Sequence, residues 1–556
     1  MEGSPMNIGE RQRKLSAWAT QDKTLRLYDL YGLLCNREWL LAAYAHVRQN
    51  KGSRTAGVDG VTAQDFEANL DGHIEKLQEA LKATTFTPDP VRRVYIPKGQ
   101  SQWRPLGIPV LKDRIVQEAL RMILEPIWEA DFLDCSYGFR PGRSTKDVMS
   151  KIHWTMIGTG YAYQWIVEGD IKSYFDSIPH QKLMKCVKKR VDDRKLQDIL
   201  WKFLRAGVLE KDIYQDTLTG TPQGGIISPL LANIYLHELD KYMMRYTNMT
   251  KVERSHRRRN RLPNFVYVRY ADDWVALCSG TKEQALELKE ELRFFLQDTL
   301  GLELSLEKTK VTHITDGFKF LGFWIDRSMS GKGKMVPKIK IPKEAIQRLQ
   351  DKIAATLANH SDSFGAKILA LNAIIRGWAH YYQHTSGPQR VFAALEHWIW
   401  WKVAHWLGRK YQISIPLVIR RYGQDNTFGT KTRRLTLPSS FKTKRYKRKT
   451  PVNPYLAEAE SLTRDVHFDF EMAWIGTENR KGWFDIRDAV LERDEHACTQ
   501  CGRSLEEYEI EVDHIKPIAR YKRPSGAEFP ENYGILCTDC HRAKTKREHQ
   551  VLSRVR

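Results

Sequence analysis

The stretch that decides the fold is FVYVRYADDWVALC, residues 265–278. Apolar, β-prone segments at 265–268 and 274–278 flank Asp272 and Asp273, which predicts a hairpin with the acidic pair at its tight turn. Two carboxylates at the tip of a buried hairpin repel each other and lose hydration. Divalent cations remove that cost, so the pattern indicates a metal site. A solvated turn explains a short acidic string equally well.

An upstream run, WIVEGDIKSYFDSI at residues 165–178, strengthens the metal interpretation. Residues 165–167 have the composition of a central strand, and Asp170 follows at its end as the third candidate ligand. Asp176 lies six residues further on and is expected to cap the start of a helix.

Further motifs surround these two runs in a fixed order. They are YIPK (95–98), WRPLGIP (103–109), DRIVQ (113–117), YGFRPGRS (137–144), GTPQGG (220–225) with SP (228–229), and FLG (320–322). This series resembles the reverse transcriptases encoded by mobile group II introns, and FLG resembles their primer-gripping strand. The resemblance implies a right-hand polymerase in which Asp170, Asp272 and Asp273 hold two Mg²⁺ ions, about 3.5–4 Å apart, and add dNTPs to a primer.

The same resemblance indicates a nucleotide site. Its candidate residues are Lys98, Arg104, Ile171, Phe175 and Gln223. Lys98 and Arg104 put two cations where a triphosphate needs neutralising, although solvated charges are the usual fate of Lys and Arg. The Phe175 ring could exclude a 2′-hydroxyl or belong to the core, and we weigh these equally. Gly224 and Gly225 could let backbone approach a nucleic acid or form a turn before a helix at 230–242.

The composition agrees with a polyanionic partner. The chain has 556 residues, enough for several domains, and its 89 basic and 67 acidic residues give a net charge of +22. Such a charge favours nucleic acid or a membrane surface. No apolar run approaches the roughly 20 residues that span a bilayer, and no secretory apolar core is present. We therefore expect a cytoplasmic protein without a membrane partner, of open oligomeric state.

Two further segments stand out between the motifs and the C-terminus. KVERSHRRRNR (251–261) is expected to be a mobile basic insertion that touches phosphates, with a solvated loop as a close alternative. FKTKRYKRKT (441–450) has six cations and no acid, which favours a linker or a nucleic-acid strap over a folded core element.

Residues 336–440 are expected to be all-helical and resemble the family's thumb, its maturase region. IRGWAHYY (375–382) and HWIWWK (397–402) are dense in Trp and Tyr, which serve as core anchors or as stacking surfaces. A core role is favoured for most of them. The cations expected to face RNA are Arg376, Lys402, Arg409 and Lys410.

Two CxxC pairs near the C-terminus indicate a second chemistry. They are Cys498 with Cys501, and Cys537 with Cys540. Four thiolates at such spacing favour a closed, tetrahedral structural Zn²⁺, with a redox pair as the lesser alternative. The interval between the pairs is longer than in zinc fingers, which an inserted hairpin would explain.

The sequence EVDHIKP (511–517) lies between the cysteine pairs, and Asn532 and His541 follow it. This constellation resembles the HNH nuclease motif, a ββα-metal unit. The resemblance implies that His514 is the general base and that Asp513 and His541 hold a catalytic ion, most simply Mg²⁺. Asn532 would orient His514. Whether the unit cuts DNA or only binds it stays open.

The whole chain thus resembles a group II intron-encoded protein with a multidomain α+β fold. The expected parts are an N-terminal extension (1–75), fingers and palm (76–335), thumb (336–440), a basic linker and DNA-binding region (441–480) and an HNH domain (481–556). The resemblance implies that the protein helps its intron RNA to splice, stays bound to the lariat and nicks target DNA to prime reverse transcription. A splicing-only maturase and a host-defence reverse transcriptase are the alternatives; the first should have lost metal carboxylates, all of which are present.

Overall fold

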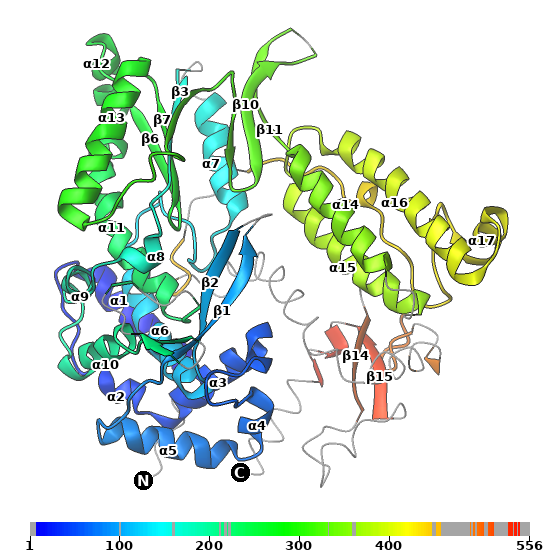
Figure 1. Cartoon of the computed structure of the whole chain (residues 1–556), viewed down its shortest axis with the longest axis horizontal. Coiled ribbons are helices and arrows are strands. Elements are labelled where there is room, and N and C mark those ends of the chain that lie inside the picture. Colours follow the sequence, from blue (N-terminus) through cyan, green and yellow to red (C-terminus); the bar gives the residue numbers. More distant parts are fainter. Residues whose placement is uncertain are drawn as a thin grey trace. The chain divides into compact units, whose positions relative to one another are not determined.

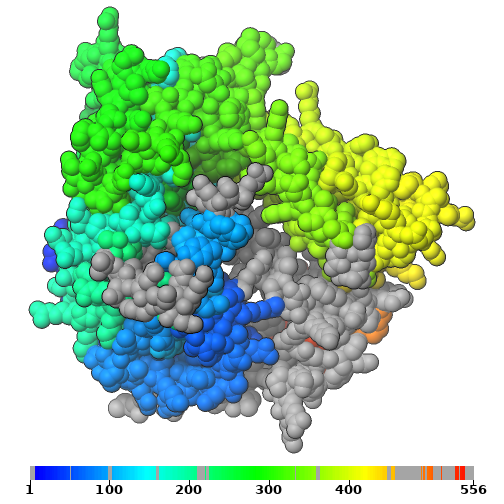
Figure 2. Space-filling model, in the orientation of Figure 1, coloured from blue at the N-terminus to red at the C-terminus, as the bar shows by residue number. Residues whose placement is uncertain are grey.

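The structure is a computed structural model of the chain (Figure 1). It describes residues 7–98, 102–157, 162–210, 213–215, 219–220, 224–331, 333–358, 363–447, 452–456, 490, 493–494, 497–504, 510–515, 532–537, 539–541 and 543–544. Figure 2 shows the molecule in space-filling form, coloured along the sequence. Two compact units are present. The first comprises Met1–Ala345, Tyr381–Pro388 and Thr443–Ala473, and the second comprises Ile346–His380, Gln389–Lys442 and Trp474–Arg556.

The first unit begins with helices around a buried central one. They are α1 (Ile8–Gln21), α2 (Tyr31–Leu34), α3 (Arg37–Gln49), α4 (Ala63–Glu67), α5 (Leu70–Lys82) and α6 (Leu111–Glu129). α6 is buried along almost its whole length and packs against α1 and α3. The Trp39 indole fixes this packing, because its N–H donates to the Ala119 carbonyl at 3.0 Å.

The fingers carry a four-stranded sheet of order β2-β1-β4-β5. Its strands are β1 (Val91–Lys98), β2 (Gln102–Ile108), β4 (Val208–Glu210) and β5 (Ile213–Gln215). β1 and β2 form an antiparallel hairpin, and Arg104 lies opposite Ile96 in its register.

The palm contains an antiparallel sheet of order β6-β7-β3-β8. Its strands are β3 (Trp165–Gly169), β6 (Phe265–Tyr270), β7 (Asp273–Cys278) and β8 (Lys310–His313). The helices of the same region are α7 (Thr145–Ile157), α8 (Tyr174–Ser177), α9 (His180–Val187), α10 (Arg194–Leu204), α11 (Ser228–Thr247), α12 (Lys251–Arg259) and α13 (Lys282–Phe294). The predicted hairpin and the central position of β3 are confirmed. α11 and α7 pack on β6, and α13 packs on β3.

Two local expectations in the palm are wrong. Residues 251–259 form helix α12 rather than a mobile loop, because Thr250 and Glu253 make both hydrogen bonds of a capping box. Asp176 does not begin a helix: Ser173, at φ 45°, is the N-cap of α8. The FLG motif is a tight turn between β9 (Phe318–Phe320) and β10 (Phe323–Met329).

The predicted thumb is largely helical, with α14 (Lys343–Ala358), α15 (Phe364–Tyr382), α16 (Pro388–Tyr411) and α17 (Ile415–Tyr422). The expectation that it is all-helical is wrong at both ends. β11 (Met335–Lys340) continues the sheet β11-β10-β9, and β12 (Gly423–Gln424) pairs with β13 (Thr427–Phe428). Most of its aromatic residues are core residues, as predicted; Trp406 is fully buried, whereas Trp401 is 41% exposed.

The basic linker packs onto the first unit instead of hanging free. Tyr446 is 9% exposed, and its ring stacks on His384 with 5.6 Å between centroids. Further along, the Tyr455 hydroxyl donates to Glu125 at 2.6 Å. The linker therefore contributes a buried residue, contrary to expectation. The expected DNA-binding region from residue 457 onward lies outside the described residues.

The C-terminal part contains the predicted inserted hairpin. β14 (Ile510–His514) pairs antiparallel with β15 (Tyr533–Cys537), with Ile510 opposite Cys537 and His514 opposite Tyr533. Among the described helices, none is both long and apolar enough to cross a bilayer.

Candidate functional site: two centres for phosphate chemistry

The three palm aspartates converge at one end of the sheet. Gly169 pairs with Trp274 and Tyr270 pairs with Asp273. Continued by one residue, this register places Asp170 beside Asp273. A side chain at Gly169 would clash with the Trp274 ring, so glycine is required where β3 delivers Asp170.

Lys308 supplies a cation to this acidic group, and sequence reasoning missed it. Its ammonium donates to Asp170 at 2.7 Å. This hydrogen bond, with the nearby charges of Asp273 and Asp272, raises the pKa of Lys308 above its ordinary value. The negative charges of the three carboxylates therefore favour a cation at this position. A metal site requires the same excess of negative charge.

The pKa of Asp272 is shifted by burial and by the charges around it. Burial raises its pKa, the Asp170 carboxylate raises it further, and Arg104 from the fingers acts in the opposite direction. A bound cation would favour the ionised form more strongly than Arg104 alone does. The positive charge of Arg104 therefore acts on Asp272, and its place in a nucleotide site stays a prediction.

Arg269 holds the turn that carries Asp272 and Asp273. It is fully buried, and its Nε donates to Asp240 at 2.7 Å. Its Nη1 donates to the Asn233 side chain at 2.9 Å and to the Ala271 carbonyl at 2.8 Å. Burial alone would lower the pKa of Arg269, but pairing with Asp240 raises it. Sequence reasoning missed this role, although a lone arginine in an apolar strand was a visible signal.

The backbone of the turn is constrained as well. Ala271 has φ 56°, in the left-handed region that only glycine enters freely. The segment 135–138 lies against it: the Tyr137 N–H donates to the Arg269 carbonyl at 2.9 Å, and a side chain at Gly138 would clash with the Ala271 backbone. The YGF motif thus braces the acidic turn from outside.

The other predicted nucleotide residues have different surroundings. Ile171 is 2% exposed, so only its main chain is available to a ligand. The half-buried Phe175 ring meets Tyr174 edge-on at 5.5 Å. Gln223 and the Lys98 side chain lie outside the described residues. Gly224, at φ 116°, approaches the Gly107 backbone of the fingers so closely that a side chain would clash.

The predicted RNA-facing cations of the thumb lie mostly on its surface. Arg376, Lys402 and Arg409 are exposed. Lys410 is half-buried, and its ammonium lies 5.4 Å from the Trp406 ring centroid. Lys410 therefore has a packing role in addition to its charge.

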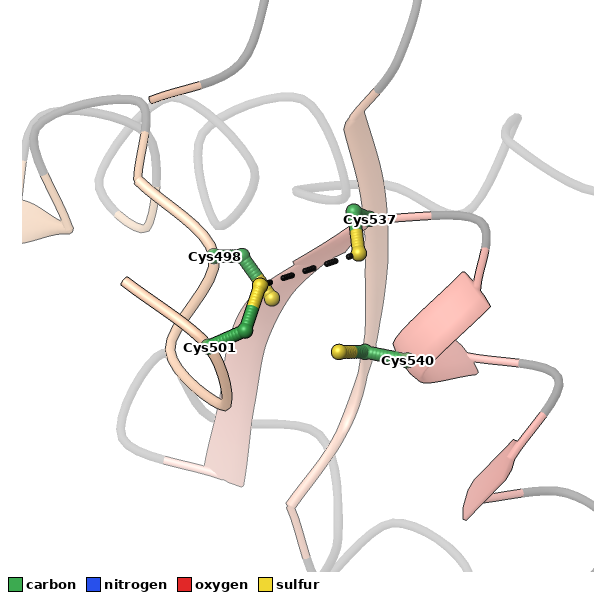
Figure 3. Close-up of side chains that lie close together, drawn as sticks. All are labelled: Cys498, Cys501, Cys537 and Cys540. Atoms are coloured by element: carbon green, nitrogen blue, oxygen red, sulfur yellow. Dashed lines mark hydrogen bonds between the residues drawn. The ribbon is translucent and has the colours of Figure 1, made fainter. Parts of the chain in front are cut away.

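The four C-terminal cysteines form a cluster that could hold a metal ion (Figure 3). Their sulfur atoms lie within 4.8 Å of one another, and among the described residues no other group of three or more potential ligands is gathered so closely. Hydrogen bonds from the Cys537 and Cys501 main chain outweigh burial and lower the pKa of Cys498 to about 6. All four thiols are free. The set fits a tetrahedral, all-sulfur ion site.

The hairpin separates this cluster from the HNH residues. Cys537 pairs with Ile510 at one end of the strands, whereas Asp513 and His514 pair with Gly534 and Tyr533 at the other. Four residue steps correspond to about 13 Å. The side chains of Asp513 and His514 lie outside the described part of the chain.

The remaining HNH candidates lie on either side of β15. Asn532 is buried, and its carbonyl accepts from the Ile515 N–H at 2.6 Å, which ties it to the end of β14. His541 is half-buried and follows Cys540 directly. The structure therefore brings Asn532 to the His514 end, while it places His541 beside the cysteines.

Removal of the metal that we expect the four cysteines to hold should unfold the C-terminal part of the chain. Structural zinc stabilises small domains by about 10 kcal/mol or more, and the apolar core of this segment is small. We expect Cys501→Ser, or treatment with a strong chelator, to abolish stoichiometric metal content and DNA nicking together. Cys35→Ser, a half-buried cysteine elsewhere, is the matched control and should retain the metal. Metal analysis showing an unchanged content in Cys501→Ser would refute the site.

Three protein families match successive parts of the chain. Residues 96–325 match the reverse transcriptase (RNA-dependent DNA polymerase) family. Residues 346–423 match the group II intron maturase-specific domain, and residues 498–547 match HNH endonuclease.

Several related proteins match a large share of the chain. Protein YkfC of Escherichia coli (strain K12) is 40% identical over 369 residues, which are 63% of this chain and 97% of that protein. The group II intron-encoded protein LtrA of Lactococcus lactis subsp. cremoris is 39% identical over 58% of this chain and 62% of LtrA, so somewhat less than two thirds of LtrA is matched. An uncharacterized 91 kDa protein in the cob intron of Schizosaccharomyces pombe is 28% identical over 91% of this chain and 68% of that protein.

Proposed function

Because this chain belongs to the group II intron-encoded proteins, with reverse transcriptase, maturase and HNH endonuclease domains in that order, we propose that it inserts its intron into DNA by target-primed reverse transcription. In this scheme the protein helps the intron RNA to splice and remains bound to the lariat. The RNA enters one strand of the target DNA. The HNH domain nicks the other strand, whose 3′-hydroxyl primes synthesis of complementary DNA.

The observation that supports the proposal is the strand register, which brings Asp170 beside Asp273 and next to Asp272, together with the Lys308 ammonium that donates to Asp170 at 2.7 Å. These carboxylates would hold Mg²⁺, which supplies charge to activate a 3′-hydroxyl and to stabilise a leaving pyrophosphate. The positive charge of Arg104 acts to lower the pKa of Asp272, and in our proposal its guanidinium neutralises the triphosphate of the incoming dNTP. Arg269 keeps the acidic turn in place.

In the nuclease domain, the two ends of the β14–β15 hairpin would have different roles. The four cysteines would hold Zn²⁺ and fix the fold. At the other end, His514 would take a proton from the attacking water, and Asn532 would orient His514. Asp513 at that end, together with His541, which directly follows Cys540, would hold an ion, in our proposal Mg²⁺, that neutralises charge on the scissile phosphate. The exposed thumb cations Arg376, Lys402 and Arg409, together with Lys410, would contact the intron RNA.

The proposal is tested by a target-primed reaction. The purified protein is combined with its intron RNA, a labelled DNA duplex taken from the sequence around the intron, and dNTPs. Wild type should nick one strand and extend the nicked end. His514→Ala should lower nicking by about 10²-fold or more, since general-base catalysis contributes about that much.

Two controls separate the activities. His514→Ala should still extend a supplied primer, and Asp272→Ala should still nick. Extension of the nicked strand by wild type without any intron RNA would contradict target-primed insertion, because the RNA is both guide and template. Nicking by His514→Ala at the wild-type rate would show that another residue is the base.

A further inference from the structure

Helix α12 is a rigid insertion in the palm between α11 and β6. The Thr250 hydroxyl accepts from the Glu253 N–H at 3.2 Å, and the Glu253 carboxylate accepts from the Thr250 N–H at 2.6 Å. This capping box fixes the start of the helix. It also engages Glu253, the sole acidic residue between 251 and 261.

The inner face of α12 is tied to the palm by its own arginines. Arg254 donates to the Thr247 carbonyl at 2.7 Å, and Arg257 donates to the Pro263 carbonyl at 2.8 Å. The Arg257 guanidinium also lies 5.8 Å from the Tyr246 ring centroid. Both flanks of the insertion are thereby tied to the palm, and the residues that stay exposed include most of its cations.

The outward face of α12 is an unneutralised basic surface. It consists of Lys251, Arg258 and Arg259 on the helix and Arg261 just after its end, all of them exposed. Within the described ranges, no carboxylate forms an ion pair with any of these four side chains. A surface helix that is merely solvated usually interleaves charges of both signs. Four adjacent cations held without a counter-charge favour a polyanion as the partner.

The helix lies at the far end of the palm hairpin from the aspartates. α12 precedes Phe265, at the start of β6, whereas the acidic turn follows Tyr270 at its end. Six residues of strand correspond to about 20 Å. Figure 1 shows α12 at the upper end of the palm, beyond α13 and the start of β6. Nucleic acid bound there is therefore separate from a primer terminus at the aspartates.

We propose that the outward face of α12 binds the phosphate backbone of folded intron RNA, as a contact separate from DNA synthesis. The proposal rests on the maturase part of the proposed function. The helix is about 13 Å long, enough to meet several phosphates, and RNA double helices are recognised largely through backbone and shape. A membrane surface fits less well, because a membrane-bound helix needs a continuous apolar face. α12 exposes one large apolar side chain, Val252.

The test removes three of the outward charges and compares the result with an equal change elsewhere. The variant is Lys251→Gln/Arg258→Gln/Arg259→Gln. The control is Lys185→Gln/Lys188→Gln/Arg194→Gln. These three cations lie on α9, at its C-cap and on α10; they are exposed and form no ion pair in the described structure. Affinity for the intron RNA is measured across a salt series, beside primer extension on an unrelated RNA template.

The variant should bind the intron RNA about tenfold or more weakly, and the slope of log affinity against log salt should fall by about 2–3, as expected for three lost phosphate contacts. Primer extension should stay at the wild-type level, and the control should match wild type in both measurements. Equal RNA affinity in variant and wild type would overturn the α12 assignment. Loss of binding to anionic vesicles, with RNA affinity intact, would assign the face to a membrane instead. A wild-type protein without affinity for the intron RNA would instead refute the maturase role itself.

Discussion

Asp272→Ala should lower DNA synthesis on an RNA template by about a thousandfold or more. The carboxylate lies in a cluster with Asp170 and Asp273, and its removal leaves too few ligands to hold metal at the primer terminus. Charge stabilisation by a metal contributes several kcal/mol to such reactions, and each 1.4 kcal/mol of barrier corresponds to about a factor of ten in rate. Single-turnover primer extension at saturating dNTP measures the effect.

The controls show whether the loss is local. Asp298→Ala removes an exposed acid from the end of the α13 region and should extend primers normally. Asp272→Ala should still bind the intron RNA and nick DNA, because the maturase and HNH regions are separate in sequence. Simultaneous loss of all three activities would mean that the substitution unfolds the protein, and near-normal synthesis would show that Asp272 is not a metal ligand.

Arg269→Met should cause the second large loss, in stability as well as in synthesis. The substitution leaves Asp240 buried without its partner, and breaking a buried ion pair in this way costs about 3–5 kcal/mol. It also removes the donor to the Ala271 carbonyl, which holds a backbone in the left-handed region. Thermal unfolding and the kcat and KM of primer extension measure the two effects.

A second substitution separates positioning from stability. Arg269→Met/Asp240→Leu replaces the pair by apolar side chains, which is often neutral or stabilising in a protein interior. The double variant should therefore regain much of the lost melting temperature, while kcat stays low and the KM for dNTP changes little. Recovery of both stability and kcat would contradict the positioning role of Arg269 and leave it as a core ion pair.

The acidic hairpin could be predicted because its signals are local. Alternating apolar residues and a two-residue turn mark β6 and β7, and Asp170 directly follows β3. The partners of these residues could not be predicted in the same way. Lys308 is 138 positions from Asp170, and Asp240 is 29 positions from Arg269. The local sequence pattern does not indicate that such distant residues meet. They are brought together by the packing of α11 and β8 in the folded chain.

The errors in the prediction also have physical causes. Residues 251–261 were predicted to be a loop because of their high charge. Thr250 and Glu253 nevertheless form a capping box, and their spacing is visible in the sequence. β12 and β13 are two residues each, too short for a periodic signal, and their turn depends on positive φ at Asp425 and Asn426. The burial of Tyr446 could not be predicted from composition. Six cations surround this residue in the sequence, so the segment has the composition of an exposed linker.

The central claim is that Asp170, Asp272 and Asp273 together hold a pair of metal ions. Counting Mn²⁺ ions by electron paramagnetic resonance, with a template, a primer lacking its 3′-hydroxyl and a matching dNTP, tests it without requiring turnover. Comparison of wild type with Asp170→Ala/Asp272→Ala cancels the ions held by the C-terminal domain. Wild type should bind two more Mn²⁺ ions than the double variant; equal numbers in the two proteins would contradict the claim.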